Sequence, residues 1–376
     1  MSEIKIALFG IGGFAANYVH AMTKPFREGV RLVGAVDPFV KECPLCPVYA
    51  TSQELYQAQQ PDLVVIATPI HFHVEQAVEA FRHGCHVVME KPIAATVEGV
   101  RQIFAARDQA GKQLSIGFQH CYDKAMLALK ADVDAGVLGA PVALKAMVLW
   151  PRDHTYYHRG SGWAGKRLDA QGRPIFDNVL SNATAHYLMN MLFMTDGPIH
   201  DIRCATYRAN PIETFDTAVL KARAANGAEV FIAVSHAAGR DHVQNPMFEY
   251  AYEQAVVRFG GPGDEEKRIV ATFTDGRVKD YGRVGSETMD NLWNTIDAIR
   301  EGTPIGCTGE MALWHVDALE QMRLLQPEST PFPASWVRED DGLIWVPGLA
   351  ESLCQCFAER SLPCWDLTQE RLMAAE

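Results

Sequence analysis

Apolar runs and amphipathic stretches alternate along the first third of the chain. The apolar runs, which predict buried β-strands, are 4–10, 31–37, 62–69, 86–92 and 113–119. The amphipathic stretches between them, which predict helices, are 13–24, 73–84 and 96–111. Thr96 and Gly111 suit the two ends of the last helix as N-cap and C-terminal residue. Because strands that are apolar on both faces lie between two layers of helices, this pattern indicates a doubly wound parallel sheet.

The pattern changes after about residue 198. Short alternating segments run to about residue 285, and Asn226-Gly227 between two of them is typical of a tight hairpin turn, so this region predicts an antiparallel sheet. Amphipathic helices are predicted over 291–302 and 308–325. We therefore expect a dinucleotide-binding type of domain over 1–122 and an α+β domain over 123–376, which ends in an extension from about residue 336.

Composition narrows the class of protein. The chain has 376 residues, enough for two domains of about 150 residues or more, and each could bury a core. Its formal net charge is -12, and no run of Lys or Arg interrupts it, which argues against nucleic acid or an anionic membrane as the main partner. The first residues enter a strand pattern without a signal-peptide layout, and nine scattered cysteines do not form a secreted disulfide framework, so a cytoplasmic protein is expected.

Metal binding is not expected. Cys43 and Cys46 have the spacing of metal ligands, but no second pair of Cys or His follows at zinc-finger distance. His71 and His73 alternate in an extended segment that no carboxylate partner follows.

The first strand-to-helix turn carries a dinucleotide fingerprint. Gly10, Gly12 and Ala15 fit the pattern G-x-G-x-x-A, in which the glycines permit a tight turn and a close approach of the backbone to a pyrophosphate. Gly13 and Phe14 complete this turn. Asp37 ends the second strand, where a carboxylate accepts hydrogen bonds from ribose hydroxyls and repels a 2′-phosphate, so NAD is favoured over NADP. The alternative is an ordinary glycine turn with a solvated aspartate.

Three further stretches resemble the Gfo/Idh/MocA oxidoreductase family, which includes glucose-fructose oxidoreductase and inositol dehydrogenase. They are TPIHFH at 68–73, EKP at 90–92 and GFQHCYD at 117–123, each at the end of a predicted strand. The resemblance implies a Rossmann domain followed by an α+β domain with an open, mainly antiparallel sheet, whose exposed face often makes the interface of a homodimer or homotetramer. It also implies cofactor-side roles for a set of residues: Thr68, Pro69, His73, Glu90, Lys91 and Gln119.

Lys91 is the first candidate catalytic residue. Pro92 keeps it extended at the tip of its strand, and the resemblance implies a cis bond between the two that aims the lysine into the cleft. Its ammonium group could hold or shuttle the proton of the substrate. The alternative is a surface lysine in an ion pair at a strand end.

His186 is the second candidate catalytic residue. Asn178, Asn182, His186 and Asn190 recur at steps of four in an otherwise apolar stretch, which predicts one polar face of a helix that begins near 176. The resemblance implies that His186 is the catalytic base and that Asn182 replaces an aspartate of the family's Asp-x-x-x-His pattern. Since an amide is neutral, we expect His186 to be a weaker base than its counterparts. The alternative is a buried core histidine.

Residues 150–167 mix aromatic and cationic side chains without apolar periodicity, which is typical of a loop that lines a cleft. Arg159 and Trp163 are candidate substrate-binding residues there, as a charged donor and a stacking face for a polyol or a sugar acid. A solvated loop is the alternative.

These features favour an NAD-dependent dehydrogenase that oxidises a secondary alcohol of a sugar, polyol or related carbohydrate derivative by hydride transfer. Because Asn182 departs from the family pattern, two other hypotheses stay open. One is an NAD-assisted elimination or glycoside-cleaving enzyme that recycles its cofactor. The other is a non-catalytic NAD-binding sensor or regulator.

Overall fold

The computed structural model describes residues 3–23, 28–160, 162–240, 244–261, 266–285 and 289–372. The chain divides into two compact units. Unit 1 consists of Met1–Asp123 and Gly285–Leu313, and unit 2 consists of Lys124–Val284 and Trp314–Glu376. Residues 285–313, which follow the predicted antiparallel region in sequence, therefore group with the N-terminal residues.

Unit 1 is built on a 6-stranded parallel sheet in the order β3-β2-β1-β4-β5-β6. Its strands are β1 Ile4–Phe9, β2 Val30–Val36, β3 Val48–Tyr49, β4 Leu63–Ile66, β5 His86–Met89 and β6 Leu114–Ile116. The doubly wound parallel sheet predicted from the sequence is confirmed, and the strand order is that of dinucleotide-binding domains.

Helices cover both faces of this sheet. They are α1 Ala16–Ala21, α2 Ser52–Ala58, α3 His73–Arg82, α4 Val97–Ala110 and α8 Asp290–Glu301, with single 3₁₀ turns η1 Gly13–Ala15, η2 Ile70–Phe72 and η3 Gln119–Tyr122. The Thr96 hydroxyl accepts a hydrogen bond from the Gly99 amide, and Gly111 ends α4 with φ 61°, as predicted. Leu292 and Ile296 of α8 pack into the same apolar cluster as Leu8 and Tyr18, which explains why this late segment belongs to unit 1.

Unit 2 is built on a 9-stranded sheet in the order β14-β13-β12-β11-β7-β10-β9-β8-β15. Its strands are β7 Pro141–Leu149, β8 Ile199–Arg208, β9 Thr217–Ala224, β10 Glu229–Ser235, β11 Gln244–Tyr252, β12 Ala255–Phe259, β13 Arg268–Phe273, β14 Val278–Arg283 and β15 Thr330–Pro331. The pairs β7–β10 and β8–β15 are parallel and the others are antiparallel. The sheet is therefore mixed and mostly antiparallel, and Gly227 takes φ 86° in the turn between β9 and β10.

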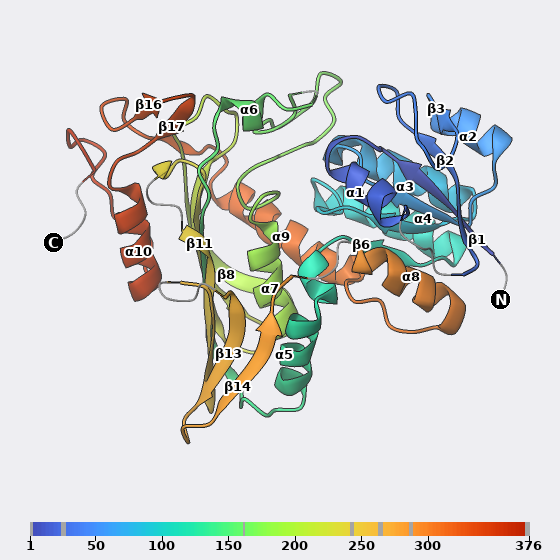
Figure 1. Ribbon diagram of the computed structural model, residues 1–376. Coiled ribbons are helices and arrows are strands. Elements are labelled where there is room, and N and C mark those ends of the chain that lie inside the picture. Colours follow the sequence, from blue (N-terminus) through green and yellow to red (C-terminus); the bar gives the residue numbers. More distant parts are fainter. Residues whose placement is uncertain are drawn as a thin grey trace. The chain divides into compact units, whose positions relative to one another are not determined.

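The two faces of the unit 2 sheet have different covers (Figure 1). On one face lie α5 Lys124–Asp134 and α7 Ala185–Thr195, and on the other lies α10 Leu349–Glu359. Leu353 and Phe357 of α10 pack against Met147 and Phe231 of the sheet. The C-terminal extension from about residue 336, to which the sequence assigned no role, thus covers part of one face of the sheet. The family resemblance had implied that this face is exposed.

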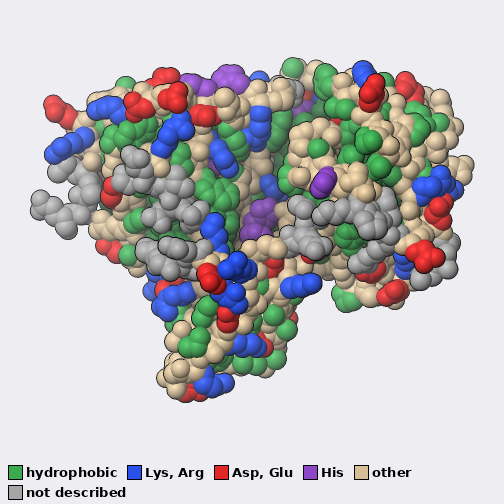
Figure 2. All heavy atoms as spheres, viewed as in Figure 1, with side chains coloured by type: hydrophobic (Ala, Val, Ile, Leu, Met, Phe, Trp, Pro, Cys, Tyr) green, Lys and Arg blue, Asp and Glu red, His purple; other side chains and the backbone are tan. Residues whose placement is uncertain are grey.

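Short elements lie at one end of this sheet. They are α6 His154–Tyr157 and the hairpin β16 Arg338–Asp340 with β17 Leu343–Trp345, and α9 Gly309–Leu325 precedes β15. His154 Nε2 lies 3.0 Å from Glu339 Oε1, so α6 and the hairpin are in contact. Within the described ranges, no helix is long and apolar enough to cross a bilayer. On the face drawn in Figure 2, Lys and Arg side chains are interspersed with Asp and Glu.

Candidate functional site

The glycine turn of unit 1 leaves its outer side open. Gly10 has φ 85°, and a Cβ placed there would lie 3.0 Å from the Ala67 carbonyl oxygen, so the turn requires glycine. Gly13 has φ 56° and would meet nothing within 4 Å. Gly12 and Phe14 are exposed, whereas Ala15 is buried where the turn enters the helix. The open, exposed backbone of the turn fits the phosphates of a dinucleotide.

Asp37 holds this turn in place. Its Oδ2 accepts a hydrogen bond of 3.0 Å from the Ile11 amide, and its Oδ1 accepts bonds from the amides of Phe39 and Val40. Three bonds leave one further lone pair on Oδ2, because each carboxylate oxygen can accept about two. Asp37 is therefore both a support for the glycine turn and a candidate acceptor for a ribose hydroxyl.

His73 ties the ends of two strands together. Its Nδ1 lies 2.9 Å from the Pro92 carbonyl oxygen, and its Nε2 lies 2.9 Å from the Thr68 carbonyl oxygen. The Lys91–Pro92 peptide bond is cis, as the family resemblance implied. Burial lowers the pKa of His73, against the opposing effect of the two carbonyl oxygens. His73 thus fixes the segment that contains Lys91, and Lys91 itself is half-buried. Pro69 is the N-cap of the 3₁₀ turn η2, which leads to His73.

A buried polar chain lies behind Lys91. Glu90 Oε1 accepts a hydrogen bond of 2.8 Å from the Tyr18 hydroxyl and one of 3.4 Å from Gln119 Nε2. Asn291 Nδ2 of α8 in turn donates to the Tyr18 hydroxyl at 2.8 Å. Burial raises the pKa of Glu90 to about 7, against the opposing effects of the Lys91 charge and the Tyr18 hydrogen bond. Glu90 and Gln119, both predicted on the cofactor side, therefore meet in the structure.

The predicted helix that carries His186 begins later than the sequence suggested. Residues 179–184 form turns, and α7 starts at Ala185, so the prediction of one polar helix face from Asn178 onward is wrong. The Asn178 Oδ1 accepts hydrogen bonds from the amides of Leu180 and Ser181, which stabilises a turn in place of helix. Asn190 is buried in the core of unit 2.

Asn182 and His186 lie on either side of the start of α7. Asn182 lies in the turn that enters α7, where its carbonyl oxygen accepts a bond of 3.4 Å from the Ala185 amide. His186 occupies the first turn of the helix, and both side chains are half-buried. Each is therefore only partly covered, as a residue that lines a substrate cleft would be.

Arg159 and Trp163 meet in unit 2. The Arg159 guanidinium carbon lies 3.6 Å from the centre of the Tyr156 ring and 5.0 Å from that of the Trp163 ring. Trp150 at the end of β7 makes an edge contact with Tyr187, the neighbour of His186, with ring centres 6.1 Å apart. The loop after β7 and the start of α7 therefore lie at the same end of this sheet.

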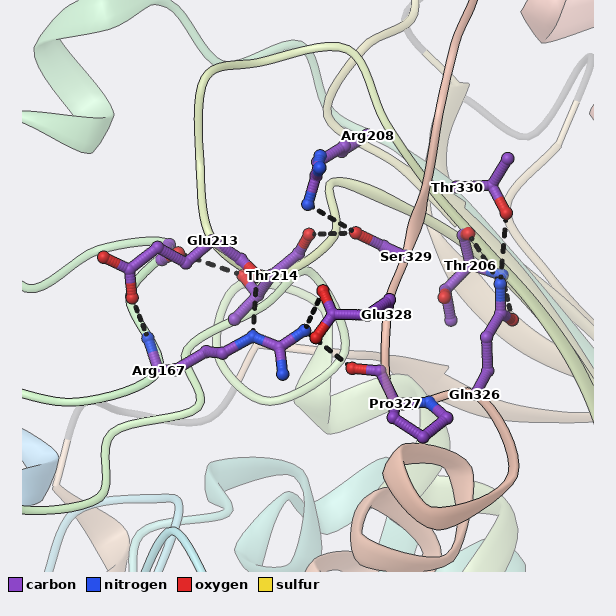
Figure 3. A network of polar contacts seen from close by, with 11 residues as sticks. Arg167, Thr206, Arg208, Glu213, Thr214, Gln326, Pro327, Glu328, Ser329 and Thr330 are labelled. Carbon is purple, nitrogen blue, oxygen red and sulfur yellow. Dashed lines mark hydrogen bonds and ion pairs between the residues drawn. The ribbon is translucent and has the colours of Figure 1, made fainter.

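A polar network fixes the second half of this loop (Figure 3). Arg167 Nε donates to the Glu213 carbonyl oxygen at 2.9 Å, and its Nη2 reaches the Pro327 carbonyl oxygen at 2.6 Å and Glu328 Oε2 at 3.0 Å. The Thr214 hydroxyl donates to the Gly165 carbonyl oxygen at 3.2 Å. The loop is thus anchored to the connection between β8 and β9 and to the segment before β15.

Three residues that the sequence did not indicate lie beside Arg159. Arg152, Tyr156 and His236 join its cluster: the Arg152 guanidinium carbon lies 5.0 Å from the Tyr156 ring centre, and the Tyr156 and His236 rings are 5.3 Å apart. The mixed aromatic and cationic loop could have indicated the first two. No local pattern indicates His236, which comes from a strand end far along the chain.

The candidate residues divide between the units. Lys91 and the cofactor-side residues belong to unit 1, and Asn182, His186, Arg159 and Trp163 belong to unit 2. Among the described residues, no group of three or more His, Cys, Asp and Glu side chains could hold a metal ion.

Two protein-family models match successive parts of the chain. Residues 4–118 match the family described as "Oxidoreductase family, NAD-binding Rossmann fold", and residues 126–258 match "GFO/IDH/MocA C-terminal domain". Among curated relatives, D-glucoside 3-dehydrogenase of Escherichia coli (strain K12) is 31% identical over 145 residues, which are 37% of this chain and 41% of the relative. Inositol 2-dehydrogenase of Klebsiella pneumoniae subsp. pneumoniae is 30% identical over 156 residues, 38% of this chain and 45% of the relative. The chain thus spans less than half of the length of these relatives.

Solved structures are similar over more of the chain. The WlbA dehydrogenase from Bordetella pertussis, in complex with NADH and UDP-GlcNAcA, superposes with a TM-score of 0.70 at 22% identity and covers 85% of this chain and 94% of its own. An oxidoreductase from Agrobacterium radiobacter, in complex with NAD+, L-tartaric acid and magnesium, gives a TM-score of 0.69 at 20% identity, over 85% and 95%. These identities establish a shared fold. Because two successive parts of the chain match the N-terminal and C-terminal domains of one family, the chain belongs to the Gfo/Idh/MocA oxidoreductases, whose N-terminal domain binds NAD.

Proposed function

We propose that this protein is an NAD-dependent dehydrogenase that oxidises a secondary alcohol of a sugar, polyol or related carbohydrate derivative. The observation that carries the proposal is the position of Lys91 just after β5 in a dinucleotide-binding sheet, in a segment whose Pro92 carbonyl oxygen contacts His73 Nδ1 at 2.9 Å. Two relatives named for the oxidation of a glucoside and of inositol support the class of substrate.

The residues of unit 1 are arranged to hold the cofactor. The turn of Gly10, Gly12, Gly13 and Phe14 would take the phosphates, and Asp37 would accept a ribose hydroxyl. When bound, NAD supplies the acceptor for the two electrons of the oxidation. Thr68, Pro69 and Gln119, at the ends of neighbouring strands, would complete the cofactor side.

Proton handling falls to Lys91 and His186. An amine and an imidazole can each take a proton from the substrate hydroxyl as it is oxidised, and the Asn182 amide can orient that hydroxyl by donating or accepting a hydrogen bond. Since Asn182 brings no negative charge to His186, the same constellation also suits a reaction in which the cofactor is recycled. That second candidate is an NAD-assisted elimination or glycoside cleavage.

The experiment is turnover of NAD with a panel of sugars and polyols. Lys91→Ala and His186→Ala should each reduce turnover by about 10² or more, since each removes a proton-handling group. Binding of NAD, measured by intrinsic fluorescence, should stay nearly intact. His200→Ala, which removes an exposed histidine on β8, is the matched control and should behave as wild type.

The outcomes separate the candidates. Net formation of NADH supports the dehydrogenase, whereas product formation at constant NADH supports the recycling reaction. Wild-type turnover in Lys91→Ala would contradict the assigned role of the lysine. Binding of NAD without turnover of any compound would favour a sensor.

The homodimer or homotetramer expected through the C-terminal sheet is part of the proposal. Because α10 covers the face at β7 and β10, an interface on this side would have to use the strands from β11 to β14. Val278 of β14 is 66% exposed and lies in this region. Light scattering coupled to size-exclusion chromatography measures the oligomeric state, and a monomer would contradict the expectation.

A further inference from the structure

Two strand ends of unit 2 bring Arg152 and His236 together. Because β7 and β10 are parallel, their carboxyl ends lie at the same edge of the sheet. The pairing continues beyond both strands: the Trp150 amide donates to the Ser235 carbonyl oxygen at 2.9 Å, and the Arg152 amide donates to the His236 carbonyl oxygen at 3.1 Å. The position of Arg152 beside His236 is therefore set by the sheet itself.

The Tyr156 ring holds two guanidinium groups. The guanidinium carbon of Arg159 lies 3.6 Å from the ring centre and that of Arg152 lies 5.0 Å from it. Trp163 and Trp150 provide second aromatic contacts, at 5.0 Å from Arg159 and 5.6 Å from Arg152. Stacking of this kind orients the planar groups. Arg159 Nη1 donates to the Tyr156 carbonyl oxygen at 3.2 Å, and a guanidinium group has further N–H donors for a partner.

The acidic side chains near this cluster are occupied elsewhere. Asp153 caps α6 by accepting a bond of 3.0 Å from the Thr155 amide. Asp177 Oδ2 accepts from the Gly165 amide at 2.7 Å, and Asp216 Oδ2 accepts from the amides of Ala209 and Asn210. Over the part of the chain that the structure describes, no carboxylate forms an ion pair with Arg152 or Arg159. Asp177 and Asp216 are close enough to act on the neighbouring tyrosines by their charges, but within the described residues neither pairs directly with Arg152 or Arg159. The two guanidinium groups repel each other, and an anion between them would relieve this repulsion.

His236 is a second sign of a missing partner. Its side chain is 2% exposed, and within the described residues neither ring nitrogen has a hydrogen-bond partner. Burial, together with the charges of Arg152 and Arg159, lowers the pKa of His236 to about 3, so the ring is neutral and can donate one hydrogen bond and accept one. The Arg152 Nε is also buried without a partner. Buried polar groups are normally paired, so a group from outside the chain is expected here.

We infer that Arg152 and Arg159 bind an anionic group of the substrate, a carboxylate or a phosphate on the sugar, beside the first turn of α7. The inference rests on the proposed function, because it takes the substrate to be a carbohydrate. Guanidinium groups match the geometry of both anions through paired N–H donors. His236 would pair with a hydroxyl of the same molecule, directly or through water. Because the Trp150 and Tyr187 rings are in contact, the anion would be held near His186.

The test measures binding and turnover of matched sugars. Glucose, glucuronate and glucose 6-phosphate, and the same three of the galactose series, differ only in the group at C6, which is a neutral alcohol, a carboxylate or a phosphate. With protein saturated with NADH, calorimetry should show that one charged member of a series binds at least tenfold more tightly than the neutral sugar. The carboxylate and phosphate arms identify which anion the site takes.

Substitutions then test whether Arg152 and Arg159 cause the tighter binding of the charged sugar. Arg152→Gln and Arg159→Gln should each weaken binding of the charged sugar about tenfold or more and leave the neutral sugar unaffected, with KM changed more than kcat. Arg159→Lys keeps the charge and loses the planar fork, so its affinity for the charged sugar should lie between those of wild type and Arg159→Gln. Arg277→Gln is the matched control, because Arg277 also stacks on a ring, Phe273 at 4.5 Å, but forms an ion pair with Asp275. It should behave as wild type.

Failure of this inference differs from failure of the proposed function. Turnover of neutral sugars without any gain from a carboxylate or phosphate overturns the inference and leaves the dehydrogenase standing. Tight binding of a charged sugar that needs both arginines, without formation of NADH, supports the inference and contradicts the dehydrogenase. Equal losses for charged and neutral sugars in the variants would show that the arginines are structural, and would overturn it.

Discussion

Glu90 should make the stability of unit 1 depend on pH. Burial raises the pKa of its carboxyl from 4.5 to about 7 in the folded protein. Between these two values the folded state binds a proton that the unfolded state has released, so the free energy of unfolding falls as pH rises through this window. The contribution of Glu90 to stability is therefore complete below about pH 4.5 and lost above about pH 7.

The size of the effect follows from the shift. A difference of about 2.5 pKa units corresponds to about 3 kcal/mol in the free energy of unfolding, at about 1.4 kcal/mol for each unit. Glu90 is 7% exposed, so screening by solvent reduces this value little. Glu90→Gln removes the titration and keeps an oxygen that can accept from Tyr18, whose hydroxyl donates to Glu90 at 2.8 Å. The variant should lose this part of the pH dependence.

The measurement is urea-induced unfolding of wild type and Glu90→Gln from about pH 5 to about pH 8. The difference between their free energies of unfolding should change by about 2.5 kcal/mol across this range in favour of the variant at the higher pH, since part of the full effect is already lost at about pH 5. The two units can unfold in separate transitions, and the change belongs to that of unit 1. Glu98→Gln on α4, whose side chain is 67% exposed, controls for loss of a charge. If the free energy of unfolding depends on pH in the same way for Glu90→Gln and wild type, the reasoning is refuted.

The remaining predictions concern the cofactor and the C-terminal cover. With Asp37 at the ribose position, NAD should bind at least tenfold more tightly than NADP, a difference of about 1.4 kcal/mol, and equal affinities in a fluorescence titration would show that the ribose assignment is wrong. Leu353→Ala, at a fully buried position of α10, should lower the free energy of unfolding of unit 2 by about 2–5 kcal/mol. Leu324→Ala, at a leucine of α9 that is 71% exposed, should change it little, and similar losses in both variants would contradict the packing of α10.

The doubly wound sheet of unit 1 could be predicted because its signals are local. Each strand is a short apolar run, and α4 is bounded by a capping threonine and by a glycine with positive φ. The start of α7 could not be predicted in the same way. Steps of four suggested a helix from Asn178, but the Asn178 side chain bonds the amides of Leu180 and Ser181 and so competes with the helix. Periodicity reports where side chains would point in a helix, not whether the backbone forms one.

The cluster around His236 shows a second limit of the sequence. His236 follows an apolar strand and gives no local signal of function. Its importance arises from the parallel pairing of β7 and β10, which places it next to Arg152, 84 residues earlier in the chain. Arg159 and Trp163 were predicted in one cleft-lining loop, and they are in contact in the structure. The partner on the neighbouring strand depends on the strand order of the sheet, which was predicted to be mainly antiparallel but without an order.

The three stretches that resemble the family, 68–73, 90–92 and 117–123, contact one another in unit 1. His73 of the first stretch bonds the carbonyl oxygen of Pro92 in the second. Gln119 of the third bonds Glu90, and a Cβ at Gly117 would lie 2.7 Å from the same carboxylate. Each stretch thus restricts the residues of another, across separations that no local pattern reveals. Lys91 is held from both sides by these contacts, so its position depends on the whole set and not on the EKP segment alone.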